Sequence, residues 1–159
     1  MPLEYRILLV DDDRQFADLL SRQLFENGYH VTELHHPRHG LEAATLRDYD
    51  VVVLARRLPE IDGLRLMKIL KGRIADLAVV MLSNENDAED RSDVLDRGAF
   101  AYLTKPCRLA EIEATIQRAI EDRCERQSSR SRQSLADMGD ARQSLAISAT
   151  EFTTQNGLR

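Results

Sequence analysis

The sequence contains no tryptophan, only two cysteines and no long hydrophobic run. Cys107 and Cys124 are too few for the disulfide framework of a small secreted domain, so we expect both to be reduced thiols. Crossing a bilayer takes roughly 20 consecutive apolar residues, and no run here approaches that length. The N-terminal segment lacks the basic region of a secretory signal peptide. These absences favour a cytoplasmic protein that makes no membrane contact.

The 159 residues suffice for one domain with a sizeable core and are too few for two full domains. Charge is spread unevenly along the chain. Residues 1–122 hold 23 acidic and 16 basic side chains, whereas residues 123–159 hold 4 acidic and 6 basic ones. Because an acidic body repels phosphate backbones, we expect no binding to nucleic acid.

Short apolar runs alternate five times with amphipathic stretches. The expected strands are 5–10, 29–34, 50–55, 77–83 and 101–104, and the expected helices are 14–28, 38–48, 63–72, 87–99 and 108–127. Such alternation predicts an α/β fold, a doubly wound parallel sheet with helices on both faces. The continuous apolar runs at 51–54 and 79–82 are typical of central, doubly buried strands.

The composition changes near residue 127. We expect a folded domain over residues 4–126 and a polar C-terminal tail over 127–159, either flexible or a helix extension. The pentapeptide RQSLA occurs at 132–136 and again at 142–146, which is too little for a repeat architecture. About 30 residues rarely fold alone, so we expect no separately folded output domain within the tail. An output domain could follow if the sequence is part of a longer protein.

In a doubly wound sheet, the ligand site lies at the carboxyl ends of the strands. Three carboxylates, Asp11 to Asp13, follow the first expected strand. Asp13 is placed to cap the next helix, while Asp11 and Asp12 exceed what capping needs and suit Mg²⁺. Ser83 ends the fourth strand, and Lys105 follows the fifth, where it could clamp a phosphoryl group. Pro106 comes next, and a cis peptide bond there would hold the loop in shape.

Four segments, ILLVDDD, VVVLARRLPEIDG, VVMLS and RGAFAYLTKP, resemble the receiver domain of two-component response regulators in order and spacing. The resemblance covers roughly residues 4–124 and implies a flavodoxin-like sheet of order 2-1-3-4-5. It also implies that Asp11 and Asp12 are the acidic pair of the metal site. By the same resemblance, Ser83 is the switch hydroxyl, Tyr102 the switch aromatic, and Lys105 and Pro106 the lysine–proline pair.

The resemblance gives special weight to position 55. In the family, the phosphate-accepting aspartate lies four residues before the proline of the LP..DG loop. Counting back from Pro59 leads to Ala55, whose methyl group has no nucleophile. The chain is therefore interpreted as a pseudo-receiver without the usual phosphoaspartate, in which the alanine is either natural or the product of an engineered substitution.

Two alternatives stay open. The first is a Mg²⁺-dependent phosphotransferase or phosphatase of the haloacid-dehalogenase type, using an aspartate of the first strand as nucleophile. The LP..DG loop and the YLTKP segment fit receivers better, and the chain has no cap domain, so we expect no enzyme. The second is a receiver that is phosphorylated at another aspartate, such as Asp12.

Loss of one carboxylate predicts weak Mg²⁺ binding by Asp11 and Asp12. Alternation of side chains along the third strand predicts that Arg57 points to the same side as Ala55, where it could neutralise the acidic pair. In receivers, the face made by the fourth helix, the fifth strand and the fifth helix carries the output. We expect this face to bind a histidine kinase, an output protein or a second copy of the chain without phosphorylation.

Overall fold

The computed structural model describes residues 4–85 and 87–156, with side chains described as far as Asp140. The chain divides into two compact units, Met1–Arg123 and Cys124–Arg159. Within the described residues, no helix is both long enough and apolar enough to cross a membrane.

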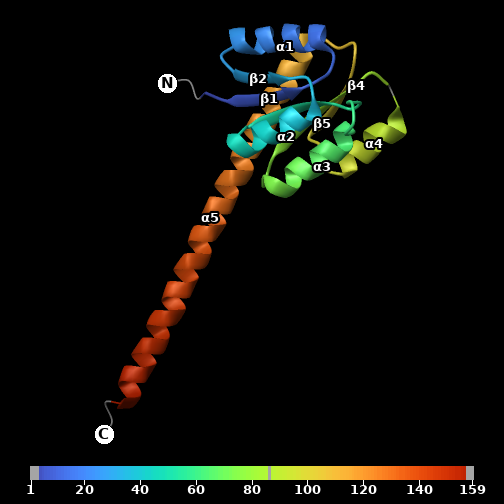
Figure 1. Ribbon diagram of the computed structural model, residues 1–159. Coiled ribbons are helices and arrows are strands. Elements are labelled where there is room, and N and C mark those ends of the chain that lie inside the picture. The colour runs from blue at the N-terminus through green and yellow to red at the C-terminus, as the bar shows by residue number, and fades with distance from the viewer. Residues whose placement is uncertain (1–3, 86, 157–159) are drawn as a thin grey trace. The chain divides into compact units, whose positions relative to one another are not determined.

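Strands and helices alternate from the N-terminus of the first unit (Figure 1). The strands are β1 (Arg6–Val10), β2 (His30–Leu34), β3 (Val51–Ala55), β4 (Ala78–Ser83) and β5 (Ala101–Thr104). The helices are α1 (Arg14–Glu26), α2 (Pro37–Leu46), α3 (Gly63–Arg73), α4 (Ala88–Asp96) and α5 (Leu109–Asn156). All strand pairs are parallel, in the order β2-β1-β3-β4-β5. The expected fold class and strand order are confirmed.

The two faces of the sheet are covered by different helices, because successive side chains of a strand point to opposite faces. One face packs against α1 and α5. The side chains from these two helices that are buried there are Ala17, Leu20, Leu24, Ile112, Ile116, Ala119 and Ile120. The isoleucines of α5 therefore cover the sheet, as their spacing of four residues predicts.

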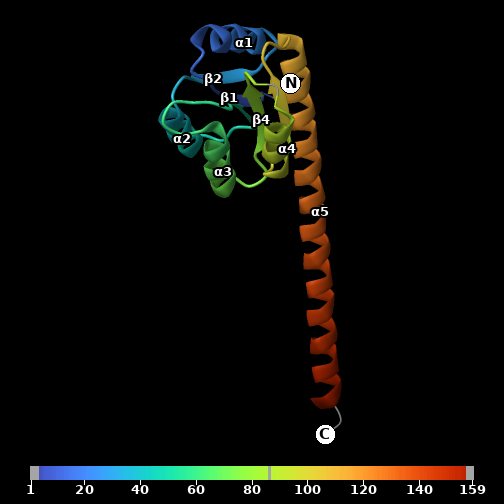
Figure 2. The same cartoon turned by 90° about the vertical axis from the view of Figure 1, so that its right-hand side faces the viewer.

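The other face packs against α2, α3 and α4. The fully or nearly buried side chains from α3 and α4 are Leu66, Met67, Leu70 and Val94. Figure 2 shows the layers from a perpendicular direction, with α1 on one side of β1 and β2 and with α2 and α3 on the other. The central strands β3 and β4 are buried along their whole length, which explains their continuous apolar sequence.

The sequence predicts that the last helix spans residues 108–127, but α5 continues to Asn156. Residues Cys124–Asn156, which lie in the second unit, have no proline and one glycine, Gly139, so little in the sequence breaks the helix. Leu135 and Met138 are exposed there by 69% and 54%. Residues 127–156 are thus a helix extension in the structure, and the expected flexibility stays a prediction.

Candidate functional site

The candidate site lies where four parallel strands end together. β1, β3, β4 and β5 all run in the same direction, so their carboxyl ends meet at one edge of the sheet. Asp11 follows β1, Ala55 and Ser83 end β3 and β4, and Lys105 follows β5. The sequence-predicted residues are therefore brought to one edge.

Lys105 and Asp11 form a buried ion pair across this edge. The Nζ of Lys105 lies 2.6 Å from Oδ2 of Asp11, whose side chain is 1% exposed. The other carboxylate oxygen of Asp11 accepts the backbone N–H of Asp13 at 2.9 Å. The Nζ of Lys105 also lies over the ring of Phe16, 4.2 Å from the ring centroid. At this distance a cation–π contact stabilises the charge. The Lys105–Pro106 peptide bond is cis, as expected.

The other two aspartates of the run divide their roles. Asp13 is the N-cap of α1, and its carboxylate accepts the N–H of Phe16 at 3.2 Å, as its position predicts. Asp12 is exposed. A divalent cation at this edge would thus find Asp12 open to solvent and Asp11 already engaged by Lys105.

Ala55 is 5% exposed and sits at the end of β3, beneath a tight turn. The turn brings the start of α3 back onto the strand, and the N–H of Gly63 donates to the carbonyl of Arg56 at 3.1 Å. A Cβ at Gly63 would lie 2.1 Å from the carbonyl oxygen of Ala55. Only glycine therefore fits the DG position of this loop.

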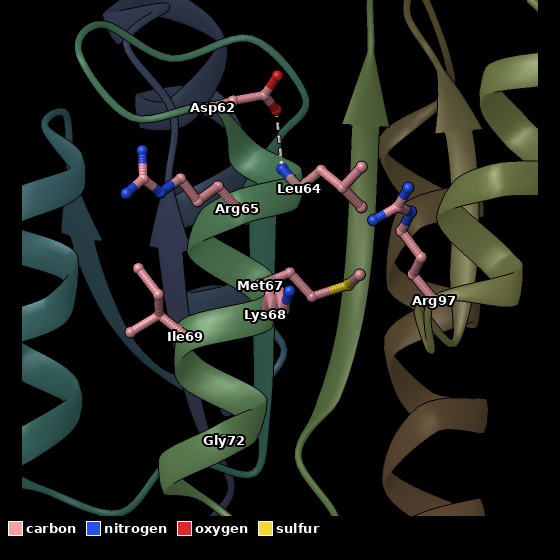
Figure 3. A pocket seen from close by; sticks show the side chains of 8 residues that line it. All are labelled: Asp62, Leu64, Arg65, Met67, Lys68, Ile69, Gly72 and Arg97. Carbon is pink, nitrogen blue, oxygen red and sulfur yellow. Dashed lines mark hydrogen bonds between the residues drawn. The ribbon is translucent and has the colours of Figure 1, made fainter.

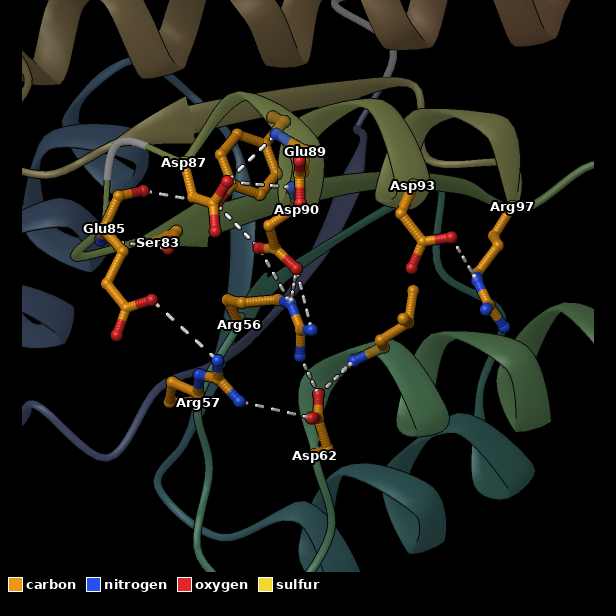
Figure 4. Close-up of polar contacts among 12 residues, drawn as sticks. Arg56, Arg57, Asp62, Ser83, Glu85, Asp87, Glu89, Asp90, Asp93 and Arg97 are labelled. Carbon is orange, nitrogen blue, oxygen red and sulfur yellow. Dashed lines mark hydrogen bonds and ion pairs between the residues drawn. The ribbon is translucent and has the colours of Figure 1, made fainter.

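Arg56 is the centre of a network of polar contacts (Figure 4). Its side chain is 9% exposed and reaches from the end of β3 to α4, where Nε and Nη2 donate to Oδ1 of Asp90 at 3.0 and 2.8 Å. Its Nη1 also donates to Asp62, the residue that caps α3. Burial disfavours the charge on Arg56, but the hydrogen bonds to Asp90 and Asp62 outweigh it and raise the pKa of the guanidinium. The hydrogen bond from Arg56 in turn holds the pKa of the Asp90 carboxyl below its usual value.

Tyr102 of β5 belongs to the same network. Its hydroxyl donates to Oδ2 of Asp90 at 2.8 Å and lies 3.3 Å from the carbonyl oxygen of Glu85. The side chain is 4% exposed and packs in the core beneath α4, and the guanidinium carbon of Arg91 lies 5.5 Å from the ring centroid. Burial, followed by the proximity of Asp90, raises the pKa of the Tyr102 phenol. The aromatic ring thus points inward and is tied to Arg56 through Asp90.

Arg57 lies elsewhere than expected. Its guanidinium is 62% exposed and lies 3.8 Å from Asp62 and 3.9 Å from Glu85, so among the described residues its ion pairs are not with Asp11 or Asp12. The reason is that β3 ends at Ala55. Beyond that residue the chain bends, and strand alternation no longer decides the side to which a side chain points.

Ser83 and Cys107 complete the site region. The Oγ of Ser83, 2% exposed, accepts the N–H of Glu85 at 3.1 Å and so shapes the loop before α4. Cys107 is partly buried against the core formed with α1 and α5. Burial, reinforced by Glu111, raises the pKa of its thiol, so Cys107 is a packing residue rather than an activated nucleophile.

The sequence analysis missed the network around Arg56. Its one signal was a pair of arginines directly after a fully buried strand, where burial of one of them demands a carboxylate partner. The partners, Asp62 and Asp90, are 6 and 34 residues further along the chain. No spacing rule links the second of them to Arg56.

Several known response regulators match this chain. The family model of the response regulator receiver domain matches residues 7–117. Transcriptional regulatory protein TcrA of Mycobacterium tuberculosis is 39% identical over 112 residues, which cover 70% of this chain and 44% of that protein. Response regulator MprA of the same species is 36% identical over 115 residues, covering 72% and 50%. The chain thus spans about half the length of the curated relatives it matches.

Solved structures agree. A response regulator receiver domain protein from Clostridium thermocellum matches with a TM-score of 0.70 and 25% identity, covering 74% of this chain and 95% of that one. NtrX from Brucella abortus, solved in complex with ADP, matches with a TM-score of 0.76 and 26% identity, covering 80% and 29%. The parallel sheet of order 2-1-3-4-5, with acidic residues and a lysine at one edge, defines a receiver fold. The chain belongs to the response regulator receiver domain family.

Proposed function

We propose that this chain is an atypical receiver of a two-component pathway that acts by protein contact, without a phosphoaspartate at position 55. It is a binding module and not an enzyme. The observation that carries the proposal is the buried contact of Arg56 with Asp90, because that contact fixes the switch aromatic, Tyr102, by an ion pair inside the protein.

The chemistry of position 55 supports the proposal. Phosphoryl transfer to a receiver needs a carboxylate at the end of β3, and Ala55 offers a methyl group that is 5% exposed. The lysine that would neutralise a phosphoryl group, Lys105, is already paired with Asp11 at 2.6 Å. Asp12, which would accept the phosphoryl group if the chain were phosphorylated at another aspartate, is exposed. Among the described contacts, no lysine ammonium group lies beside it.

The same arrangement supports weak binding of Mg²⁺. Asp11 and Asp12 are the residues that would hold the ion, which in a receiver supplies charge neutralisation at the phosphoryl group. A bound ion would compete with Lys105 for Asp11 and would lack a third carboxylate. The dissociation constant should therefore lie well above about 1 mM.

Coupling to a partner runs through the face made by α4, β5 and α5. Tyr102 lies in β5 and touches Asp90 and Arg91 of α4, so its inward position and the position of α4 depend on each other. A ring held inward by Arg56 keeps this face in one state. We assign to this face the contact with a histidine kinase, an output protein or a second copy of the chain.

The proposal is tested by comparing the chain with its Ala55→Asp variant. Both proteins are treated with acetyl phosphate and Mg²⁺ and examined by intact-mass spectrometry, and their self-association is measured by analytical ultracentrifugation with and without the phosphodonor. We expect no added phosphoryl group on the unchanged chain. We also expect its degree of self-association to be the same with and without the phosphodonor. The Ala55→Asp variant serves as the positive control for labelling.

Two results would contradict the proposal. Near-complete labelling of the unchanged chain, mapped to Asp12 by peptide sequencing, would make it a phosphorylatable receiver. A chain that binds neither itself nor a cognate kinase, and gains both properties only when phosphorylated Ala55→Asp is used, would mean that the alanine disables a conventional switch. An aryl phosphatase assay on the unchanged chain covers the enzymatic alternative, for which we expect no turnover above the rate of the Asp11→Asn variant.

A further inference from the structure

A groove of about 810 Å³ runs along α3 on the side of the molecule that also carries α4. Neither Ala55 nor Lys105 lines it, and the output face described above does not include α3. Its walls combine apolar and cationic side chains, and the residues that line it include Asp62, Leu64, Arg65, Met67, Lys68 and Arg97.

The floor of the groove is apolar. Figure 3 shows Leu64 and Met67 pointing from α3 toward Arg97, which follows α4. Met67 is 1% exposed and belongs to the core, whereas Leu64 is only partly buried. An apolar surface that the protein's own side chains leave partly open gains from being covered, because burial removes that surface from water.

The rim of the groove is cationic, in contrast to the rest of the domain. Helix α3 carries four basic side chains and no acidic one, although residues 1–122 have an excess of acidic side chains. Arg65 and Lys68 are exposed, and neither forms an ion pair or side-chain hydrogen bond with the residues that the structure describes. Arg97 is paired with Asp93 at 2.9 Å, in an exposed contact that costs little to exchange for another carboxylate.

We propose that this groove binds a short acidic amphipathic segment of a partner protein. Apolar side chains of the segment cover the exposed part of Leu64, which lies beside the buried Met67, and its carboxylates pair with Arg65, Lys68 and Arg97. Charge complementarity selects an acidic occupant, and the apolar floor selects a peptide over a nucleic acid, whose backbone would leave that floor uncovered. A helical segment presents apolar and acidic residues on adjacent faces at the required spacing.

Asp62 gives the groove a direction. It lies at the end where α3 begins and offers a carboxylate instead of a cation, so the carboxylates of the segment face the Lys68 and Arg97 region. Asp62 also accepts a hydrogen bond from Arg56. The groove therefore shares one residue with the network that holds Tyr102, although the inference does not depend on the state of position 55.

The probe for this inference is a fluorescein-labelled helical peptide of about 14 residues with leucine on one face and glutamate on the flanks, long enough to be partly helical. Its matched control has lysine at every glutamate position. Binding to the full chain is followed by fluorescence anisotropy. We expect the acidic peptide to bind, the basic peptide not to bind, and the affinity to fall as salt is raised toward 0.5 M, where ion pairs at a surface are screened (about 4 Å Debye length).

Gly72 allows the groove to be blocked without harming the fold. It lines the groove, and a Cβ at this position meets no other atom within 4 Å. The Gly72→Leu variant should therefore fill the groove while improving the helix propensity of α3. We expect it to weaken binding of the acidic peptide at least about tenfold, with a thermal midpoint no lower than that of the unchanged chain.

Charge reversal on α3 provides the matched control. Lys68→Glu, inside the groove, should weaken binding about tenfold or more, whereas Arg73→Glu, an exposed residue of the same helix that does not line the groove, should change it less than about twofold. Equal losses for the two variants would reduce the effect to general attraction between charges and overturn the proposal. So would a lack of binding by the acidic peptide, unchanged binding in Gly72→Leu, or equally tight binding of a single-stranded oligonucleotide of the same charge.

Discussion

Arg56 and Asp90 face each other at the edge of the sheet, with two guanidinium nitrogens 2.8 and 3.0 Å from the same carboxylate oxygen. One residue follows β3 and the other lies in the first turn of α4, so the pair joins the loop after Ala55 to the helix that covers Tyr102. Several N–H groups that converge on one carboxylate, with Nε also 3.1 Å from Oδ2, fix geometry as well as charge. The site thus contains a largely buried ion pair that joins the loop after β3 to α4.

The two neighbouring arginines should differ sharply in what their removal costs. Arg56→Gln leaves Asp90 largely buried without its cation, and we expect the free energy of unfolding to fall by about 3 kcal/mol. Arg57→Gln removes an exposed residue with long ion pairs and should cost about 0.5 kcal/mol. Urea denaturation of both variants measures the difference. Equal losses would mean that Arg56 is no more important to stability than its neighbour.

Tyr102→Phe removes the hydroxyl that donates to Asp90 at 2.8 Å while keeping the ring in the core. We expect a loss of about 1.5 kcal/mol, because a hydrogen bond to a charged partner is broken. In the double variant with Arg56→Gln, the loss of unfolding free energy should be smaller than the sum of the two single losses by about 0.5 kcal/mol or more, since both residues contact Asp90. Additive losses in the double-mutant cycle would show that the two contacts are independent.

Asp90 should make the fold sensitive to acid. Its hydrogen bond with Arg56 holds the pKa of its carboxyl below the usual value, helped by the hydrogen bond from Tyr102. A depressed folded-state pKa contributes stability that is fully present above about pH 4 and is lost as the pH falls further, toward the folded value. Unfolding free energies measured between pH 5 and pH 2.5 should therefore fall less steeply for Asp90→Asn than for the unchanged chain. Parallel slopes would refute this assignment.

Two glycines of α3 should respond in opposite directions to a methyl group. At Gly63 a Cβ would lie 2.1 Å from the carbonyl oxygen of Ala55, so Gly63→Ala should destabilise the protein by about 2 to 3 kcal/mol as the loop is forced away. At Gly72 a Cβ meets open space, so Gly72→Ala should stabilise it by about 0.5 to 1 kcal/mol. Thermal unfolding followed by circular dichroism provides the comparison. A neutral Gly63→Ala would mean that the turn is looser than described.

Restoring a carboxylate should strengthen the binding of Mg²⁺. Isothermal titration of the unchanged chain should give a dissociation constant above about 1 mM, and Ala55→Asp should lower it by about tenfold, since a third carboxylate joins Asp11 and Asp12. Lys105→Ala should also tighten binding, because it frees Asp11 from its 2.6 Å ion pair. Tight binding by the unchanged chain would show that Ala55 does not weaken the metal site.

Several features followed from the sequence because they depend on local pattern. Alternating apolar runs and amphipathic stretches predicted the strands and helices, and parallel strands bring their carboxyl ends to one edge whatever the details of packing. Asp11, Ser83 and Lys105 were therefore placed correctly, and so was Asp13 as a helix cap. The strand order came from motifs that resemble the receiver family rather than from the pattern itself.

The roles of the two arginines were decided only by the tertiary structure. Strand alternation assigned Arg57 to the site, but β3 ends at Ala55, and in the bend that follows the chain turns Arg56 inward and Arg57 outward. Asp90 lies 34 residues away and meets Arg56 only because β4 and α4 are folded beside β3. The groove along α3 likewise depends on how two helices pack, which no local spacing encodes. Sequence thus determined which elements form and where they end together, while contacts between distant elements decided which arginine is buried against Asp90 and so lies beside Tyr102.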